Sequence, residues 1–211
     1  FTGSDWCGWC IKLDKEVFGQ DAFIAEGPKH FVFLKLDFPR QKQLSDDLKK
    51  QNAEWQRKFA IQGFPTIILA DATGKPYAKT GYRPGGPEAY LKHLDELRAN
   101  RAKRDEAFAK AAAAQGAEKA QLLDAALAAL DADMAMNAYG DVVDEILKLD
   151  ADGKAGLKAK YEGKRTVGKV EAALHSRKFD EAIALADEAI KAVGNTGETA
   201  QDILFAKSLA F

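Results

Sequence analysis

Hydrophobic and polar residues follow two different patterns along the chain, and the change falls near residue 98. Before it, short apolar runs rich in aromatic and β-branched residues are separated by Gly, Pro and Asp, which is typical of alternating helices and strands. After it, apolar residues recur every three or four positions in an alanine-rich background, which predicts helices. We therefore predict an α/β domain over residues 1–98 and an all-α domain over residues 99–211.

The first domain is predicted to have the order helix, strand, helix, strand, strand, helix. Its clearest strand is 31–38, a nearly continuous apolar run of the kind found in sheets covered on both faces. A turn at 71–76 separates the apolar run 64–70 from 77–80, which predicts a hairpin. Helical spacing covers the segments 7–18, 21–25, 39–59 and 87–97.

The second domain is predicted to contain about six helices, because glycine and polar breaks recur at helical lengths. The breaks lie at Gly116, 137–140, 150–153, 176–178 and 194–197, and the last helix is expected over 199–211. A weak repeat aligns the segment starting at Gly116 with the one starting at Lys178. The offset is near twice the tetratricopeptide period, and this half loosely resembles a tetratricopeptide-like array.

The balance of charged residues indicates which kinds of molecule the chain can bind. The chain of 211 residues has 31 Lys and Arg against 32 Asp and Glu, for a net charge of −1, and no basic block stands out. This balance argues against nucleic acid as the main partner. No apolar run approaches the roughly 18 residues that a membrane-spanning helix needs, so no span is predicted.

Both cysteines of the chain lie in the stretch Asp5–Lys12, two residues apart. Cys7 is expected at a helix N-terminus, where free N–H groups and the helix dipole favour an anion and lower the pKa of the thiol. Cys10 follows three residues later on the same helical face, so the two sulfurs can form a disulfide or a dithiol pair.

The cysteine pair has two alternative interpretations. A structural disulfide is possible, but a bridge across so short a loop removes little chain entropy. Half of a zinc site would need a second pair of ligands, and the three histidines, His30, His93 and His175, are scattered. Redox chemistry is the favoured interpretation, with no metal.

The predicted element order and three sequence features resemble the thioredoxin family. The features are Trp6-Cys7-Gly8-Trp9-Cys10, the run 31–37, and Gly63-Phe64-Pro65-Thr66. The resemblance implies an α/β thioredoxin-like fold and a protein thiol–disulfide oxidoreductase whose Cys7 attacks and whose Cys10 resolves. It implies no cofactor beyond the redox-active Cys7–Cys10 disulfide, and protein disulfides and a redox partner protein as partners.

The same resemblance assigns the other site residues. Substrate binding is expected from five of them, namely Trp6, Gly8, Trp9, Phe64 and Pro65, with Pro65 in a cis peptide bond. Lys35 matches a family lysine that could assist thiolate formation; alternatively, it points to solvent at the strand end. Trp9, between the cysteines, and the run 14–18 after them look like thioredoxin-like proteins of bacterial cell envelopes, which implies a periplasmic or secreted location.

The family's first strand, its first helix and most of its central strand have no counterpart here, so the fold is expected to be N-terminally incomplete and the sequence a fragment of a longer chain. A rival interpretation is a non-enzymatic scaffold, in which the helical domain binds a protein and the first domain is a redox-responsive module. Intact Cys7 and Cys10 favour the enzyme.

Overall fold

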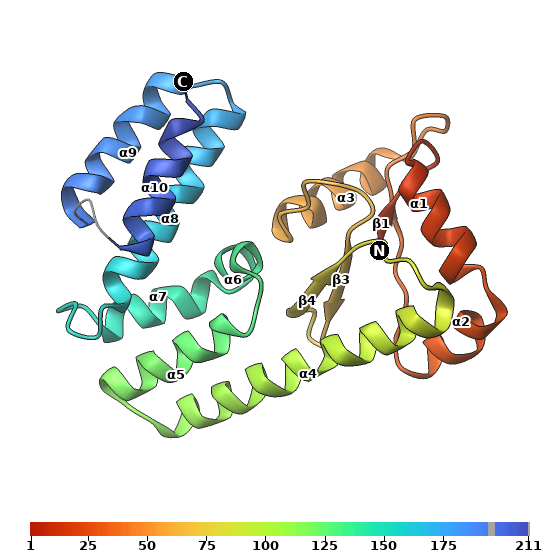
Figure 1. Ribbon diagram of the computed structural model, residues 1–211, viewed down its shortest axis with the longest axis horizontal. Coiled ribbons are helices and arrows are strands. Elements are labelled where there is room, and N and C mark those ends of the chain that lie inside the picture. Colours follow the sequence, from red (N-terminus) through yellow and green to blue (C-terminus); the bar gives the residue numbers. More distant parts are fainter. Residues whose placement is uncertain (194–196, 211) are drawn as a thin grey trace. The chain divides into compact units, whose positions relative to one another are not determined.

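A computed structural model describes residues 1–193 and 197–210 of the chain (Figure 1). The chain forms two compact units. The first comprises Phe1–Ala107 and Ala125–Tyr139, and the second comprises Phe108–Asp124 and Gly140–Phe211. The sequence-based domain boundary at 98 lies within helix α4, Gly86–Ala113, which continues for several turns beyond it.

The sheet of the first unit is built from two strand pairs. Strand β1 (Thr2–Gly3) runs parallel to β2 (Leu36–Asp37), and β3 (Ile67–Ala70) forms an antiparallel hairpin with β4 (Pro76–Thr80), as predicted. An antiparallel bridge between Thr2 and Thr66 joins the two pairs. The Thr2 hydroxyl strengthens this join, because its Oγ1 donates to the Thr66 carbonyl at 2.9 Å and accepts from the Thr66 N–H at 3.0 Å.

The prediction of a strand over 31–38 is wrong in its extent and in its burial. Only Leu36–Asp37 is a strand, since β1 offers just two residues for pairing. Within the described residues no strand lies opposite 31–35, and three apolar side chains there, Val32, Phe33 and Leu34, are exposed. A strand's length therefore depends on its partner as much as on its own sequence.

Four helices of the first unit lie close to their predicted positions. Helix α1 (Gly8–Leu13) continues into a π-helical turn η1 (Asp14–Phe18), and α2 (Asp21–Glu26) is followed by the 3₁₀ turn η2 (Gly27–Lys29). Helix α3 (Asp46–Lys58) begins later than predicted, because the Ser45 hydroxyl accepts the Leu48 N–H and so caps its first turn. The apolar core collects side chains from α1, η1, α2, the hairpin and α4: Leu13, Val17, Phe23, Ile67, Leu69, Tyr77, Ala78, Tyr90 and Leu94.

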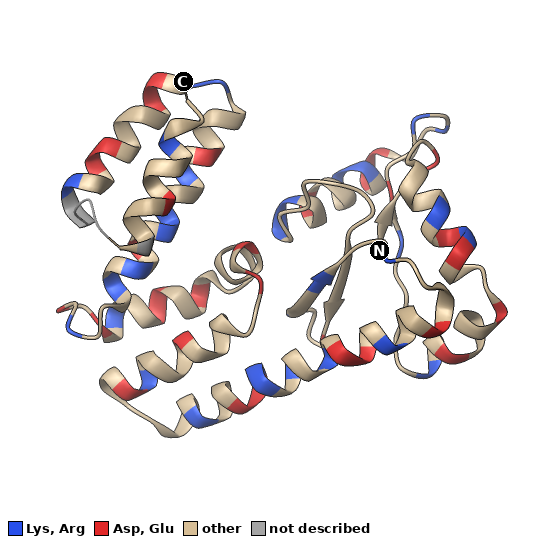
Figure 2. Ribbon diagram, in the orientation of Figure 1, with Lys and Arg blue, Asp and Glu red and all other residues tan. Residues whose placement is uncertain are grey.

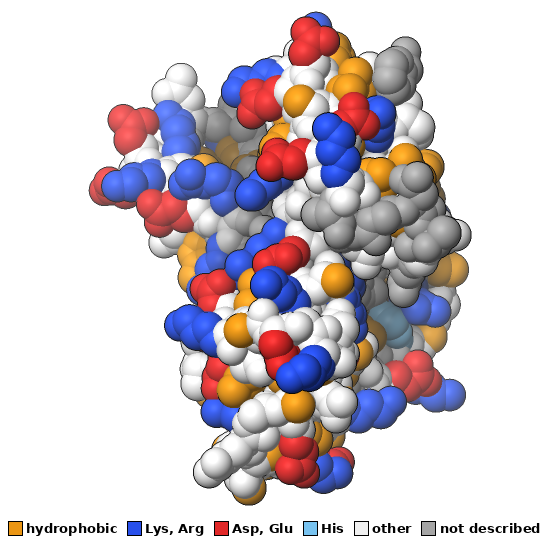
Figure 3. Space-filling model, turned by 90° about the vertical axis from the view of Figure 1, so that its left-hand side faces the viewer, with side chains coloured by type: hydrophobic (Ala, Val, Ile, Leu, Met, Phe, Trp, Pro, Cys, Tyr) orange, Lys and Arg blue, Asp and Glu red, His pale blue; other side chains and the backbone are white. Residues whose placement is uncertain are grey.

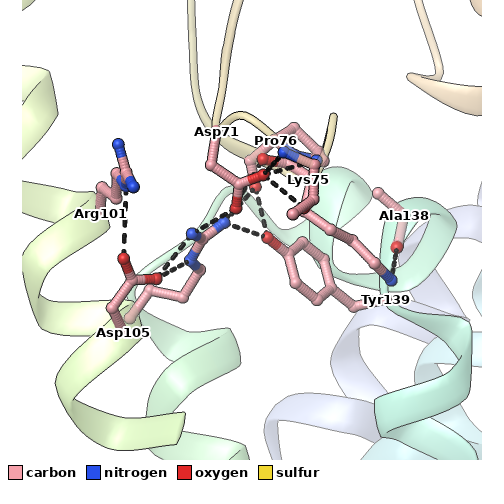
Figure 4. A network of polar contacts seen from close by, with 9 residues as sticks. Asp71, Lys75, Pro76, Arg101, Asp105, Ala138 and Tyr139 are labelled. Carbon is pink, nitrogen blue, oxygen red and sulfur yellow. Dashed lines mark hydrogen bonds and ion pairs between the residues drawn. The ribbon is translucent and has the colours of Figure 1, made fainter. Parts of the chain in front are cut away.

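A segment from the predicted helical half belongs to this first unit. Helix α6 (Ala132–Ala138) ends beside Tyr139, and Leu130 packs against the core just described. The guanidinium of Arg104, on α4, connects this segment with the β3–β4 turn (Figure 4). Its Nη1 donates to the Tyr139 hydroxyl at 2.7 Å and its Nη2 to Asp71 Oδ2 at 2.7 Å. The Tyr139 hydroxyl in turn donates to the Pro76 carbonyl at 2.6 Å.

The second unit is helical, which confirms an all-α region after the α/β part. Its complete helices are α7 (Gly140–Leu149), α8 (Leu157–His175), α9 (Phe179–Val193) and α10 (Glu198–Ser208). The last three pack side by side (Figure 1) around six small or branched core residues: Val170, Ala173, Ala182, Ala186, Ile203 and Ala206. Gly163 allows α8 and α10 to approach closely, because a Cβ there would overlap the Thr199 side chain.

Most predicted breaks separate helices here, but one break was missed. Helix α5 (Gly116–Ala128), which both units share, ends before α6, and Asp131 caps α6 by accepting the Met134 N–H at 3.2 Å. The predicted break at 194–197 lies largely outside the described residues, as does Phe211 in the predicted last helix. The face drawn in Figure 3, on the side of the C-terminal helices, mixes acidic and basic side chains.

Candidate active site at the Cys7–Cys10 pair

The two cysteines form a disulfide at the start of α1. Cys7 is the residue that caps the helix, and its Sγ accepts the Cys10 N–H at 3.2 Å, while the two Cα atoms lie 5.2 Å apart. A sulfur that accepts a helix N–H is stabilised as an anion, so this position suits an attacking thiolate. Both residues are buried in the disulfide state, Cys7 with 6% and Cys10 with 3% of its surface exposed. The position of Cys7 at the helix start therefore does not leave it exposed in the oxidised form.

The loop containing Pro65 lies against the loop that leads into Cys7. The Phe64–Pro65 peptide bond is cis, as predicted. The Phe64 ring contacts the Trp6 ring edge to face at 5.7 Å and the Phe38 ring at 5.1 Å. Among the described residues, neither the N–H nor the carbonyl of Phe64 makes a hydrogen bond to another backbone group. The Phe64 backbone can therefore accept an extended partner segment.

Aromatic side chains flank the disulfide on the surface. Trp6 is 39% exposed and Trp9 is 58% exposed. The Trp9 ring packs on Tyr82 at 5.2 Å, and the Lys12 ammonium lies 5.2 Å from Trp9 and 5.1 Å from Tyr82. Gly8, which lies between Trp6 and Trp9 in the sequence, is exposed and has open space where a Cβ would be. Such an apolar surface around a disulfide suits a polypeptide substrate.

The segment 38–41 is fixed to the motif loop through main-chain atoms. The Phe38 carbonyl accepts both the Ser4 hydroxyl at 2.5 Å and the Trp6 indole N–H at 2.8 Å. The Asp5 carboxylate accepts the backbone N–H groups of Arg40 at 3.2 Å and Gln41 at 3.4 Å. The Arg40 hydrogen bond is the main cause that lowers the pKa of Asp5, with burial acting in the opposite direction. These hydrogen bonds attach the loop to the residues that directly precede Cys7.

Arg40 was not identified as a site residue from the sequence, although the order of the strands indicates its position. Its guanidinium lies over the Trp6 ring at 4.1 Å. Because β1 and β2 are parallel, the residues that follow them meet at the same edge of the sheet. Cys7 follows β1 and Arg40 follows β2, so a predicted parallel pair would have placed them close together.

Lys35 lies at the opposite end of the same strand pair. Thr2 pairs with Leu36, which places Lys35 beside Phe1, before β1 begins. Its ammonium lies over the Phe1 ring at 5.7 Å. The proposed influence of Lys35 on the thiols remains a prediction that this contact does not support.

In 1–193 and 197–210 no group of three His, Cys, Asp or Glu side chains is arranged to hold a metal ion. None of the helices in these ranges combines the length and the apolar composition needed to cross a bilayer.

Comparison with known proteins confirms the resemblance for the first part of the chain. Residues 1–98 match the family model of the thioredoxin-like domain. The chain is 35% identical over 91 residues to the disulfide bond reductase DsbH of Chlamydia pneumoniae, covering 43% of this chain and 55% of that protein. It is 33% identical over 69 residues to the thioredoxin-related protein DsbJ of the same organism, covering 33% of this chain and 20% of that protein.

A solved structure of a DsbH oxidoreductase is 33% identical to this chain, with a TM-score of 0.44 over 46% of this chain and 67% of its own. The chain thus spans little more than half of one curated relative and a fifth of the other. The similarity covers the α/β part that holds Cys7, Cys10 and Pro65.

Proposed function

We propose that this chain, whose residues 1–98 belong to the thioredoxin-like family, is a thiol–disulfide oxidoreductase that acts on protein disulfides. The observation that carries the proposal is the Cys7–Cys10 disulfide at the start of α1, next to the loop with the cis bond before Pro65. The names of the two curated relatives, a disulfide bond reductase and a thioredoxin-related protein, support the same chemistry.

The reaction proceeds in two exchanges. The Cys7 thiolate attacks one sulfur of the substrate disulfide, forming a mixed disulfide and releasing the other substrate sulfur as a thiolate that takes up a proton. The Cys10 thiolate, formed as its proton leaves to solvent, then attacks the Cys7 sulfur. This step releases the second substrate thiolate and leaves the Cys7–Cys10 disulfide. The substrate gains two electrons and the protein loses two.

The different positions of the two sulfurs support the assignment of roles. Cys7 caps α1 and its sulfur accepts the Cys10 N–H, a position that stabilises a thiolate and favours the attacking role. Cys10 lies within the first turn of α1 and does not cap the helix, so it is placed to attack the Cys7 sulfur next to it. A dithiol partner protein is required to reduce the resulting disulfide again.

We propose reduction of substrates as the working direction, on the basis of the relative named a disulfide bond reductase. The unpaired Phe64 backbone and the exposed Trp6 and Trp9 provide a surface for an extended segment of the substrate. A periplasmic or secreted location follows from the likeness to bacterial envelope proteins, and cell fractionation with an antibody against this chain tests it.

The test is an insulin reduction assay with dithiothreitol as the electron source. The protein should accelerate precipitation of the insulin B chain, and Cys7→Ala should return the rate to that of dithiothreitol alone. Cys10→Ala should accumulate a mixed disulfide that is visible as a mass increase under non-reducing conditions. Acceleration that survives Cys7→Ala, or no acceleration by the native protein, contradicts the proposal.

A second candidate function is protein binding by the helical region without redox chemistry. The exposed apolar side chains of Phe205, 67% exposed, and Leu209, 57% exposed, near the end of α10 favour it. Under this alternative, partner binding is unchanged by Cys7→Ala and lost on Phe205→Ser. A pull-down with both variants distinguishes a scaffold from an enzyme.

A further inference from the structure

Arg40 places a positive charge at one side of the disulfide. Its guanidinium stacks on Trp6, at 4.1 Å from the ring, and Trp6 directly precedes Cys7 and contacts Phe64. In Figure 2 the ribbon of this loop, coloured blue at its basic positions, lies near the start of α1. A segment that pairs with the Phe64 backbone would therefore pass close to this charge.

The charge of Arg40 is not neutralised by an ion pair within the described part of the chain. Asp5 uses its carboxylate oxygens to accept the backbone N–H groups of Arg40 and Gln41. The neighbouring cation Lys42 is paired with Asp37 at 2.9 Å.

A second cation near the disulfide, Lys12, has an acidic neighbour. Lys12 lies 3.9 Å from Glu16, and Glu16 also accepts the Tyr82 hydroxyl at 2.5 Å. Among the described residues around the site, Lys12 and Lys42 have acidic neighbours and Arg40 has no ion pair, so Arg40 can offer its charge to a substrate. It is also held in place, because its backbone is fixed by Asp5 and its side chain by the Trp6 ring.

We infer that Arg40 determines specificity, and that the preferred substrate disulfide has Asp or Glu next to the cysteine that Cys7 attacks. The inference rests on the proposed function and deepens it, since it concerns which protein disulfides this site selects. A carboxylate of the substrate would form a charge-assisted hydrogen bond with the planar guanidinium. A substrate lysine at the same position would be repelled.

The experiment uses the full chain and three synthetic disulfides, the oxidised dimers of Ala-Xaa-Cys-Ala with Glu, Gln or Lys at Xaa. The reduced protein is mixed with each peptide at low ionic strength, and the second-order rate constant is measured by quenching with acid and chromatography. The rate should fall in the order Glu, Gln, Lys, with about a five-fold step between Glu and Gln, typical of an exposed charge pair. Raising the salt to 0.5 M should reduce the difference.

Variants at position 40 separate charge from structure. Arg40→Gln should remove the preference, and Arg40→Glu should reverse it, so that the Lys peptide becomes the fastest; damage to the fold cannot produce a reversal. The control Arg57→Gln removes an equal charge from an exposed position on α3 and should keep the wild-type order.

The possible failures can be told apart. If the wild-type protein reduces none of the peptides, the proposed function fails and this inference with it. If it reduces all three at equal rates, or if Arg40→Glu keeps the wild-type order, the specificity inference is overturned while the proposed function stands.

Discussion

Replacing Arg104 tests whether a residue beyond 98 stabilises the domain that holds the cysteines. The Arg104 side chain is 4% exposed and Asp71, its partner in the β3–β4 turn, is 12% exposed. Asp105 accepts from the same guanidinium at 2.6 Å, and Tyr139 is bound as well (Figure 4). Arg104→Met removes the cation and leaves the Asp71 carboxylate without that partner in a low-dielectric site.

The expected loss follows from the burial of this pair. Removing one partner of a buried ion pair costs roughly 3–5 kcal/mol, and the half-exposed Asp105 side chain places this case near the lower end, about 3 kcal/mol. The pKa of Asp71 is lowered, as expected for a carboxylate that its partners stabilise in the folded protein. Burial would raise it, but hydrogen bonds from Thr73, Arg104 and the Lys75 N–H outweigh burial and lower it from 3.8 to about 2. That shift corresponds to at most roughly 2 kcal/mol.

Urea unfolding followed by tryptophan fluorescence measures this loss directly. All three tryptophans, Trp6, Trp9 and Trp55, lie in the first unit, so their signal follows that unit alone. The matched control is Arg101→Met, which makes the same change one turn earlier on α4, where the side chain is 50% exposed. The control should change the free energy of unfolding by less than about 0.5 kcal/mol.

The pH dependence gives a second signature. Because the folded pKa of Asp71 is below its ordinary value, its contribution to stability is complete above about pH 5 and is lost as the pH falls through 4 towards 2. Arg104→Met should show a smaller loss over this range than the wild-type protein. The reasoning is refuted if Arg104→Met and Arg101→Met unfold at the same urea concentration with the same slope.

Three further predictions address the cysteines and the second unit. In the reduced protein, iodoacetamide should alkylate Cys7 before Cys10 and at a lower pH, as judged by peptide mass mapping; equal or reversed reactivity would exclude Cys7 as the attacking thiol. Gly163→Ala should destabilise the packing of α8 against α10 by about 1–3 kcal/mol, measured by circular dichroism, and Thr199→Ala should restore part of it by removing the overlapping methyl group; failure of this rescue would contradict the packing argument. Asp150→Ala should lower the melting temperature of the second unit, because its carboxylate accepts three backbone N–H groups at 2.8–2.9 Å at the start of α8; an unchanged melting temperature would show that these bonds are replaced by water.

The features that could be predicted are those encoded locally. The hairpin of β3 and β4, the cap at Cys7 and the cis bond before Pro65 each follow from a few adjacent residues. The short length of β2, Leu36–Asp37, could not be predicted, since it depends on how many residues of β1 lie opposite it.

Long-range pairing explains the other differences. In the sequence, Arg104 is one more arginine in a charged helical run, and nothing local indicates that its guanidinium reaches Asp71 and Tyr139. Arg40 is similar, because its place near the disulfide follows from the parallel pairing of β1 with β2. The missed break between α5 and α6 is different: Asp131, a good capping residue, was a local signal.

The way in which the segment 38–41 is held has a consequence for how this protein can diverge. The hydrogen bonds that hold it reach only main-chain atoms: the carbonyl of Phe38 accepts from Ser4 and Trp6, and the N–H groups at 40 and 41 donate to Asp5. The side chains at positions 40 and 41 can therefore change during evolution while these main-chain hydrogen bonds are kept. Single substitutions at these two positions would then alter substrate preference among homologues without changing the positions of Cys7 and Cys10.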